Sequence, residues 1–96
     1  MSVYAVAQLT FRDRPAYDRY QAAFVPVFKQ FNGRVLVADE KPQQLEGRWP
    51  YQKIVILEFP DEASFRAFSG SHAYEEIARD RRLGADATVI LARGIG

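Results

Sequence analysis

Few side chains in this sequence of 96 residues could carry chemistry, and Glu58 is the most informative of them. It interrupts KIVILEF, the most apolar run of the chain, at residues 53–59. A carboxylate within an apolar strand is costly unless it is paired, hydrogen-bonded or protonated. One interpretation makes Glu58 a candidate catalytic base with a raised pKa, pointing toward the helices into a pocket. The alternative is a structural ion pair with an arginine, or a strand-end residue that reaches solvent.

Trp49 is the only tryptophan and directly precedes Pro50, which restricts it to extended conformations and so fixes its direction. It could wall a ligand pocket beside Glu58, in the same chain or in a partner, because a rigid aromatic ring suits a planar ligand. Alternatively it pins the long connection before strand 53–59 and seals a dimer edge. We treat Trp49 as a candidate ligand-binding residue.

Other polar side chains could line the same pocket, although each has a simpler interpretation. Gln8 is polar within an apolar run, and His72 is the only histidine, expected in the exposed first turn of a helix. Tyrosines can pack in a core with the hydroxyl at its edge. The predicted ligand-binding set beyond Trp49 is Gln8, Tyr20, Ser71, His72 and Tyr74.

The sequence predicts neither a metal site nor a cofactor. A single histidine and the absence of cysteine leave no usual zinc set, and no glycine-rich phosphate loop or Ser-His-Asp order is present. The run RDRR at residues 79–82 is interpreted as a solvated helix end, where the helix dipole favours cations. The net charge of +1 gives no electrostatic case for nucleic acid or an anionic membrane.

Length and composition predict one globular domain over residues 1–96. Hydrophobic residues make up 48% of the chain and charged residues 26%, a balance typical of folded proteins. The start, MSVYAVAQLTF, lacks the basic and long apolar regions of a signal peptide, and no apolar stretch approaches the roughly 20 residues that span a bilayer. We therefore expect a soluble, cytoplasmic protein.

Periodicity and turn residues predict four strands and two helical regions, the second in two pieces. Asp13 or Arg14 would cap the first helix, Asp61 and Ser71 the later ones, and Gly33 would end the first helix in the left-handed conformation. Pro26 should kink or restart the first helix. The predicted strands are 3–11, 34–40, 53–59 and 86–93, and the predicted helices are 15–31, 61–69 and 72–83.

The order β-α-β-β-α-β predicts an α+β, ferredoxin-like split βαβ fold. Right-handed crossovers place the first and third strands at the centre of a four-stranded antiparallel sheet, with the helices on one face. Strands 3–11 and 53–59 are nevertheless apolar on both faces. We therefore expect the uncovered face to pack against a second copy, giving a homodimer in which two sheets face each other as a barrel-like pair.

Five stretches together resemble one small family: AQLTFRDRPAYDRY, NGRVLVAD, LEGRWP, VILEFPDEASFRAF and SHAYEEIARDRR. The sequence resembles the domain of unknown function 1330 family, within the dimeric α/β-barrel superfamily, over nearly its whole length. The most specific part is E-G-x-W-P followed by V-I-x-E-F-P, supported by S-x-x-Y at Ser71 and Tyr74. The chain departs from the pattern at Asn32, often glycine, and at His72, often proline.

This resemblance implies the dimeric α/β-barrel fold and says little about activity. The superfamily also contains cofactor-free monooxygenases, isomerases and haem proteins. Haem-degrading relatives carry a histidine on the second helix, and the comparable place near Ala78 has none. The sequence therefore leaves two interpretations open. One is a small-molecule pocket between sheet and helices with cofactor-free acid–base or monooxygenase-type chemistry, and the other is a non-catalytic structural or ligand-binding dimer.

Overall fold

The computed structural model describes all residues from 1 to 96, and its elements follow the order that the sequence predicts. The strands are β1 (Val3–Phe11), β2 (Arg34–Asp39), β3 (Lys53–Phe59) and β4 (Ala85–Arg93), and the helices are α1 (Arg14–Phe28), α2 (Glu62–Ser69) and α3 (His72–Gly84).

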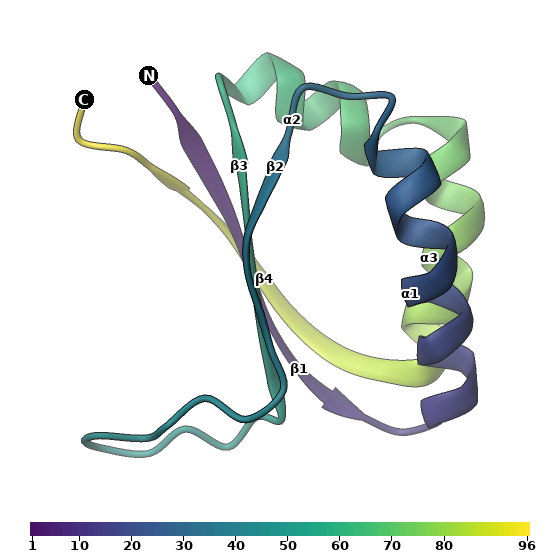
Figure 1. Ribbon diagram of the computed structural model, residues 1–96, viewed down its shortest axis with the longest axis vertical. Coiled ribbons are helices and arrows are strands. Elements are labelled where there is room, and N and C mark those ends of the chain that lie inside the picture. The colour runs from purple at the N-terminus through teal and green to yellow at the C-terminus, as the bar shows by residue number, and fades with distance from the viewer.

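The four strands form one antiparallel sheet in the order β2-β3-β1-β4. Figure 1 shows the three helices on one side of this twisted sheet, while the connection between β2 and β3 extends away from the helices. The predicted ferredoxin-like topology, with β1 and β3 at the centre, is therefore confirmed. None of the helices has both the length and the apolar character needed to cross a membrane.

Side-chain caps begin all three helices, as the sequence predicts. Asp13 accepts a hydrogen bond from the Ala16 backbone N–H at 3.3 Å, and Asp61 accepts one from the Ser64 N–H at 2.7 Å. The Ser71 hydroxyl accepts one from the Tyr74 N–H at 3.1 Å. Each cap satisfies a donor that the first turn of a helix leaves unpaired, so these three residues fix where the helices start.

Helix α1 ends earlier than predicted, at Phe28 rather than Phe31. The Phe31 N–H bonds to the Phe28 carbonyl, a spacing of three residues that tightens the chain into a turn. Of the two alternatives predicted for Pro26, a restart of the helix is wrong, because α1 continues through this residue. The other alternative, a kink, stays a prediction. Gly33 has no positive φ, so the predicted left-handed cap is wrong. A Cβ on Gly33 would lie 2.5 Å from Phe28 and 2.8 Å from Phe59, so close packing requires glycine there.

The core lies between the sheet and the helices. Alternate residues of β1 and β3 point to the helices and are buried there, among them Val3, Ala5, Leu57 and Phe59. The opposite set carries Val6, Ile56 and Ile90 in adjacent positions on three strands, and Ile90 is 57% exposed. The face away from the helices thus carries an apolar row that no other element of a single chain covers.

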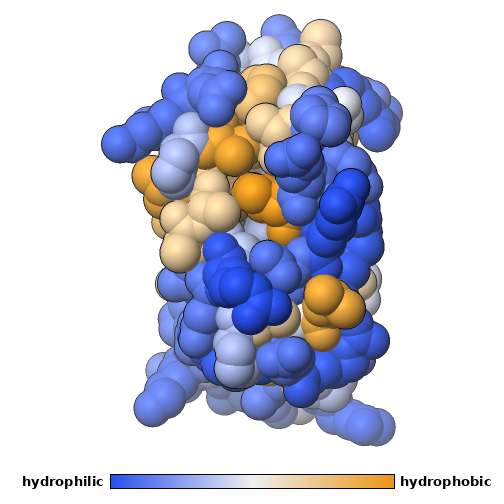
Figure 2. All heavy atoms as spheres, turned by 90° about the vertical axis from the view of Figure 1, so that its right-hand side faces the viewer, coloured by the Kyte–Doolittle hydropathy of each residue, from blue (hydrophilic) through white to orange (hydrophobic).

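The helical side presents a different surface. Figure 2 views this side, and hydrophilic side chains surround a smaller group of apolar ones in its upper half. The outer faces of the helices therefore face water, as expected for amphipathic helices whose apolar stripe packs inward.

Candidate functional site

A cavity of about 490 Å³ lies between the sheet and the helices. Of the 21 residues that line it, 15 are hydrophobic, and the rest place polar groups along its wall. Its volume lies within the range of ligand pockets, about 300–1,000 Å³. The sheet contributes Ala5, Ala7, Leu9, Lys53, Val55 and Leu57, and the helices contribute Tyr17, Tyr20, Gln21, Phe24, Phe68, Tyr74 and Arg81, among others.

The local sequence explains why this space is open. The core divides into two clusters, one around Phe28, Phe59 and Phe68 and the other around Leu9 and Tyr17. Both clusters contribute residues to the cavity wall. Ala5 of the first cluster and Ala7 beside the second face the helices from β1, and their small side chains leave volume that longer ones would fill.

A pair of tyrosines from two helices lies in the wall. The hydroxyls of Tyr20 on α1 and Tyr74 on α3 are 3.2 Å apart and share a hydrogen bond. Burial, together with neighbouring Tyr74, raises the pKa of Tyr20 far above its ordinary value, so its hydroxyl stays protonated at neutral pH. Two hydroxyls supply two protons, and their mutual bond uses one. The pair therefore has one O–H left to donate to another group.

The cationic part of α3 reaches the same cavity. Arg81 lines the wall, and its Nε is buried without a hydrogen-bond partner. Glu75 and Arg82 also line it and pair with each other, with Oε1 and Nη1 3.0 Å apart. This arginine lowers the pKa of Glu75, which therefore stays ionised. Arg81 makes no ion pair, and its place in the cavity wall is one that the interpretation of residues 79–82 as a solvated helix end did not foresee.

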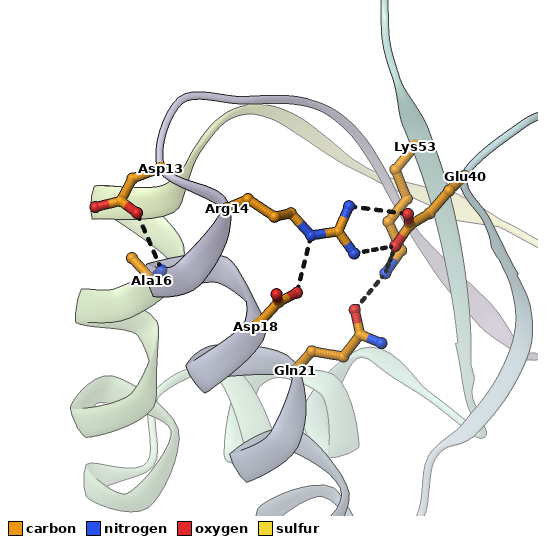
Figure 3. Close-up of polar contacts among 7 residues, drawn as sticks. All are labelled: Asp13, Arg14, Ala16, Asp18, Gln21, Glu40 and Lys53. Atoms are coloured by element: carbon orange, nitrogen blue, oxygen red, sulfur yellow. Dashed lines mark hydrogen bonds and ion pairs between the residues drawn. The ribbon is translucent and has the colours of Figure 1, made fainter.

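Lys53 at the start of β3 is a buried cation in the cavity, with 4% of its surface exposed. Its Nζ donates to Oε1 of Gln21 at 3.0 Å and lies 3.7 Å from Oε2 of Glu40 (Figure 3). It also lies 4.8 Å from the centre of the Tyr17 ring, within cation–π range. These three neighbours compensate the buried ammonium.

Arg14 completes this network from the start of α1. Its guanidinium donates to both carboxylate oxygens of Glu40, at 2.9 and 2.8 Å, and its Nε donates to Asp18 at 2.8 Å (Figure 3). The forked bond lowers the pKa of Glu40 below its ordinary value. The network ties α1 to the end of β2 and the start of β3. With two cations and two carboxylates, it has no net charge.

Glu58 lies elsewhere, so the prediction that it points toward the helices is wrong. Glu58 on β3 lies opposite Tyr4 on the neighbouring strand β1, and both side chains lie on the face of the sheet away from the cavity. Arg34 donates to its Oε1 from Nε at 3.0 Å, and the Tyr4 hydroxyl donates to its Oε2 at 3.2 Å. Arg34 lowers the pKa of Glu58, contrary to the raised pKa expected of a buried base. The geometry matches the alternative interpretation, a structural ion pair.

The remaining predicted residues divide between the cavity and other places. Tyr20 and Tyr74 line the cavity. Gln8 instead lies between its strand neighbours Ile54 and Thr88, on the opposite face of the sheet. Trp49 does not line the cavity of its own chain. It packs against Tyr51 with ring centres 5.5 Å apart, within the connection between β2 and β3. A contact of Trp49 with a partner chain stays a prediction.

Ser71 and His72 also lie outside the cavity. The Ser71 hydroxyl is occupied as the cap of α3 and donates to the Phe68 carbonyl at 2.8 Å. The His72 side chain is 87% exposed and lies 3.0 Å from Glu76 one turn later. This position agrees with the simpler interpretation of His72 as an exposed first-turn residue.

Sequence reasoning missed Lys53 and Arg81 as cations of the cavity, although spacing carried a signal for both. Lys53 shares the alternation of Val55, Leu57 and Phe59, which places it on the helical face of β3. Arg81 follows Tyr74 by seven residues, which places the two on one face of a helix. Gln21, which follows Tyr17 by four, was missed in the same way.

A family model described as a domain of unknown function (DUF1330) matches residues 2–95. The chain belongs to this family. No curated protein matches it in sequence.

Solved structures share the fold of this DUF1330 protein over nearly its whole length. A protein of unknown function from Rhodopseudomonas palustris is 20% identical, with a TM-score of 0.82, over 99% of this chain and 83% of the other. SnoaB, a cofactor-independent oxygenase from Streptomyces nogalater, is 15% identical, with a TM-score of 0.70, over 99% and 94%. A dimeric ferredoxin-like protein of unknown function from Jannaschia sp. is 14% identical, with a TM-score of 0.70, over 98% and 100%. At these identities the likeness shows the shared fold.

Proposed function

We propose that this DUF1330 protein binds a small, largely apolar organic molecule between its sheet and its helices. The observation that carries the proposal is the cavity of about 490 Å³, with its mainly hydrophobic lining and its few polar groups. A binding site needs apolar area for affinity and a few fixed polar groups for orientation, and this cavity offers both. A purely structural protein would instead be expected to fill such space, because protein interiors are close-packed.

A cavity-filling variant tests the proposal. Ala7 lies on β1 in the cavity wall, so Ala7→Phe would place a ring in the space that a ligand needs. Ala67→Phe makes the same change on an exposed position of α2 that does not line the cavity, and serves as the control. A screen of small organic compounds by thermal shift should find molecules that raise the melting temperature of the natural protein and of the control.

The expected effect is large enough to measure. A ligand at about 100 times its dissociation constant adds roughly 2.7 kcal/mol of stability, or roughly 10–20 °C for a domain of this size. Ala7→Phe should remove this shift while Ala67→Phe retains it. If the ring at position 7 leaves binding of every active compound unchanged, the ligands lie elsewhere and the proposal fails.

A catalytic role without a cofactor is a second proposal, and the fold shared with the cofactor-independent oxygenase SnoaB favours it. The cavity contains polar groups that could hold a substrate and hydrogen-bond to charge that develops on it, namely the Tyr20–Tyr74 pair and Lys53. The compounds found in the screen should be incubated with the protein in air and followed by mass spectrometry and oxygen consumption. Chemical change that Ala7→Phe abolishes supports catalysis, whereas unchanged compounds favour the non-catalytic, ligand-binding alternative.

We also propose that the active form is a homodimer that pairs the uncovered sheet faces. Only 14 of the 96 residues are buried in a single chain, a small core for a domain of this length. The apolar row of Val6, Ile56 and Ile90 on this face would gain burial in a face-to-face pair. Two of the similar solved structures, from Jannaschia sp. and Thermobifida fusca, are described as dimeric ferredoxin-like proteins.

A further inference from the structure

The polar wall of the cavity on helices α1 and α3 has features of an anion-binding site. Tyr20, Tyr74 and Arg81 all line the cavity, and Arg81 follows Tyr74 by two turns on the same face of α3. The tyrosine hydroxyls are 3.2 Å apart and have one O–H beyond the bond they share. Two helices thus contribute three groups that can donate hydrogen bonds to the wall of one cavity.

The Nε of Arg81 is the one buried side-chain nitrogen or oxygen without a hydrogen-bond partner in the chain. A buried donor left unpaired costs free energy, so each such group in a folded protein needs an explanation. The Nε itself is closed to the cavity, so a ligand acceptor would meet the Nη groups of the same guanidinium, which make no hydrogen bond or ion pair within the chain. The guanidinium also offers its other N–H groups in a planar fork, which matches the two oxygens of a carboxylate.

The balance of charge distinguishes this wall from the other polar part of the cavity. Glu75 and Arg82 neutralise each other, so Arg81 leaves one surplus positive charge. By contrast, Lys53 and Arg14 are matched by Glu40 and Asp18. An incoming anion would therefore find an uncompensated cation at Arg81 and a neutral network at Lys53.

We propose that Arg81, with the Tyr20–Tyr74 pair, binds a carboxylate, so that the ligand is a small organic acid with an apolar body. This inference rests on the proposed function and specifies its ligand class. The apolar body would lie against Phe24 and Phe68, which line the same cavity. Tyr20 remains a donor to the carboxylate because its hydroxyl stays protonated at neutral pH.

Two matched probes test the proposal, 2-naphthoate and its neutral counterpart 2-naphthalenemethanol. They share the aromatic body and differ in the charged group. Calorimetry or titration by NMR should show that the natural protein binds the acid at least about tenfold more tightly, because hydrogen bonds to charged groups contribute roughly 1.5–3 kcal/mol. Ala7→Phe should weaken both probes, which shows that they occupy the cavity.

Arg81→Met should lower the affinity for 2-naphthoate by about tenfold to hundredfold and leave that for 2-naphthalenemethanol unchanged. Arg79→Met is the matched control, since Arg79 is exposed on the same helix and does not line the cavity. It should leave both affinities unchanged. Unchanged binding of the neutral probe reports an intact cavity, and Arg81→Gln is a second variant of similar length should Arg81→Met not fold.

The outcomes separate this inference from the proposed function. Equal binding of the two probes, or a preference for the acid that Arg81→Met and Arg81→Gln both leave intact, overturns the inference while the cavity remains a binding site. Failure of both probes to bind at millimolar concentration overturns the inference and counts against the proposed function as well.

Discussion

Replacing Gly84 by alanine should loosen the contact between helix α3 and the start of α1. Gly84 is the last residue of α3, and its carbonyl accepts the backbone N–H groups of Arg12 and Asp13 at 2.8 and 3.2 Å. A Cβ at this position would lie 2.5 Å from the backbone nitrogen of Tyr17 and 2.8 Å from its Cα. Ordinary contact begins at 3.4 Å, so the closest pair is 0.9 Å too short.

The magnitude follows from what can move. The opposing atoms are backbone atoms of a helix, so no side chain can rotate away, and the two helices must separate. Overpacking of this kind costs about 1–3 kcal/mol, and rigid neighbours favour the upper end. Alanine recovers roughly 0.4–1 kcal/mol by restricting the unfolded chain. The net loss should be about 2 kcal/mol, which lowers the melting temperature by roughly 8–16 °C.

Thermal and denaturant unfolding followed by circular dichroism would measure this loss, at equal protein concentration because association also affects stability. Gly70→Ala is the matched control at the end of α2, where the nearest atom to a Cβ is the Arg66 carbonyl oxygen at 3.0 Å. It should change stability by less than about 1 kcal/mol. A melting temperature for Gly84→Ala equal to that of the natural protein would refute the reasoning, because it would mean that the helices are not held at this distance.

Two further predictions concern the sheet face away from the helices. Light scattering after size exclusion should give twice the chain mass of 11.0 kDa. Ile90→Lys should give the monomer mass, whereas the control Ile95→Lys, at the exposed C-terminus, should keep the dimer mass. A monomer mass for the natural protein would contradict the proposed pairing. Glu58→Gln should lower stability at pH 7, because Arg34 loses its partner and because the pKa of Glu58 is lower in the folded chain than its ordinary 4.5. The stabilising effect of the carboxylate is present above pH 4.5 and is lost as the pH falls through the folded pKa, so Glu58→Gln and the natural protein should become equally stable in acid. The control Glu46→Gln, on the exposed connection, should match the natural protein at every pH. Equal stability of Glu58→Gln and the natural protein at pH 7 would contradict the ion pair.

Local sequence determined most of the architecture. The strands β1 and β3 have the predicted bounds, and Asp13, Asp61 and Ser71 cap helices where polar residues precede an apolar stripe. These features depend on neighbours within a few residues, through alternation in strands and unpaired N–H groups at helix starts. The topology then follows from the element order, since right-handed crossovers leave few arrangements.

The orientation of β3 could not be determined in this way. Both of its faces are apolar, with Ile54 and Ile56 on one side and Val55 and Leu57 on the other, so alternation alone does not say which side the helices cover. The structure decides it through distant residues. Phe59 packs against Phe28, Phe65 and Phe68 of α1 and α2, and this contact turns Glu58 to the opposite face.

The polar groups of the cavity depend on tertiary structure for the same reason. Lys53, Gln21 and Glu40 come from a strand start, a helix and a connection, and nothing in their local sequence states that they meet. Arg81 lies in a basic run that is typical of a solvated helix end, and only the packing of α3 beside α1 and the sheet brings it to the cavity wall. The sequence thus determined the elements and their order, whereas contacts between residues far apart in the chain decided which side chains share the cavity, because burial and pairing are properties of the assembled layers.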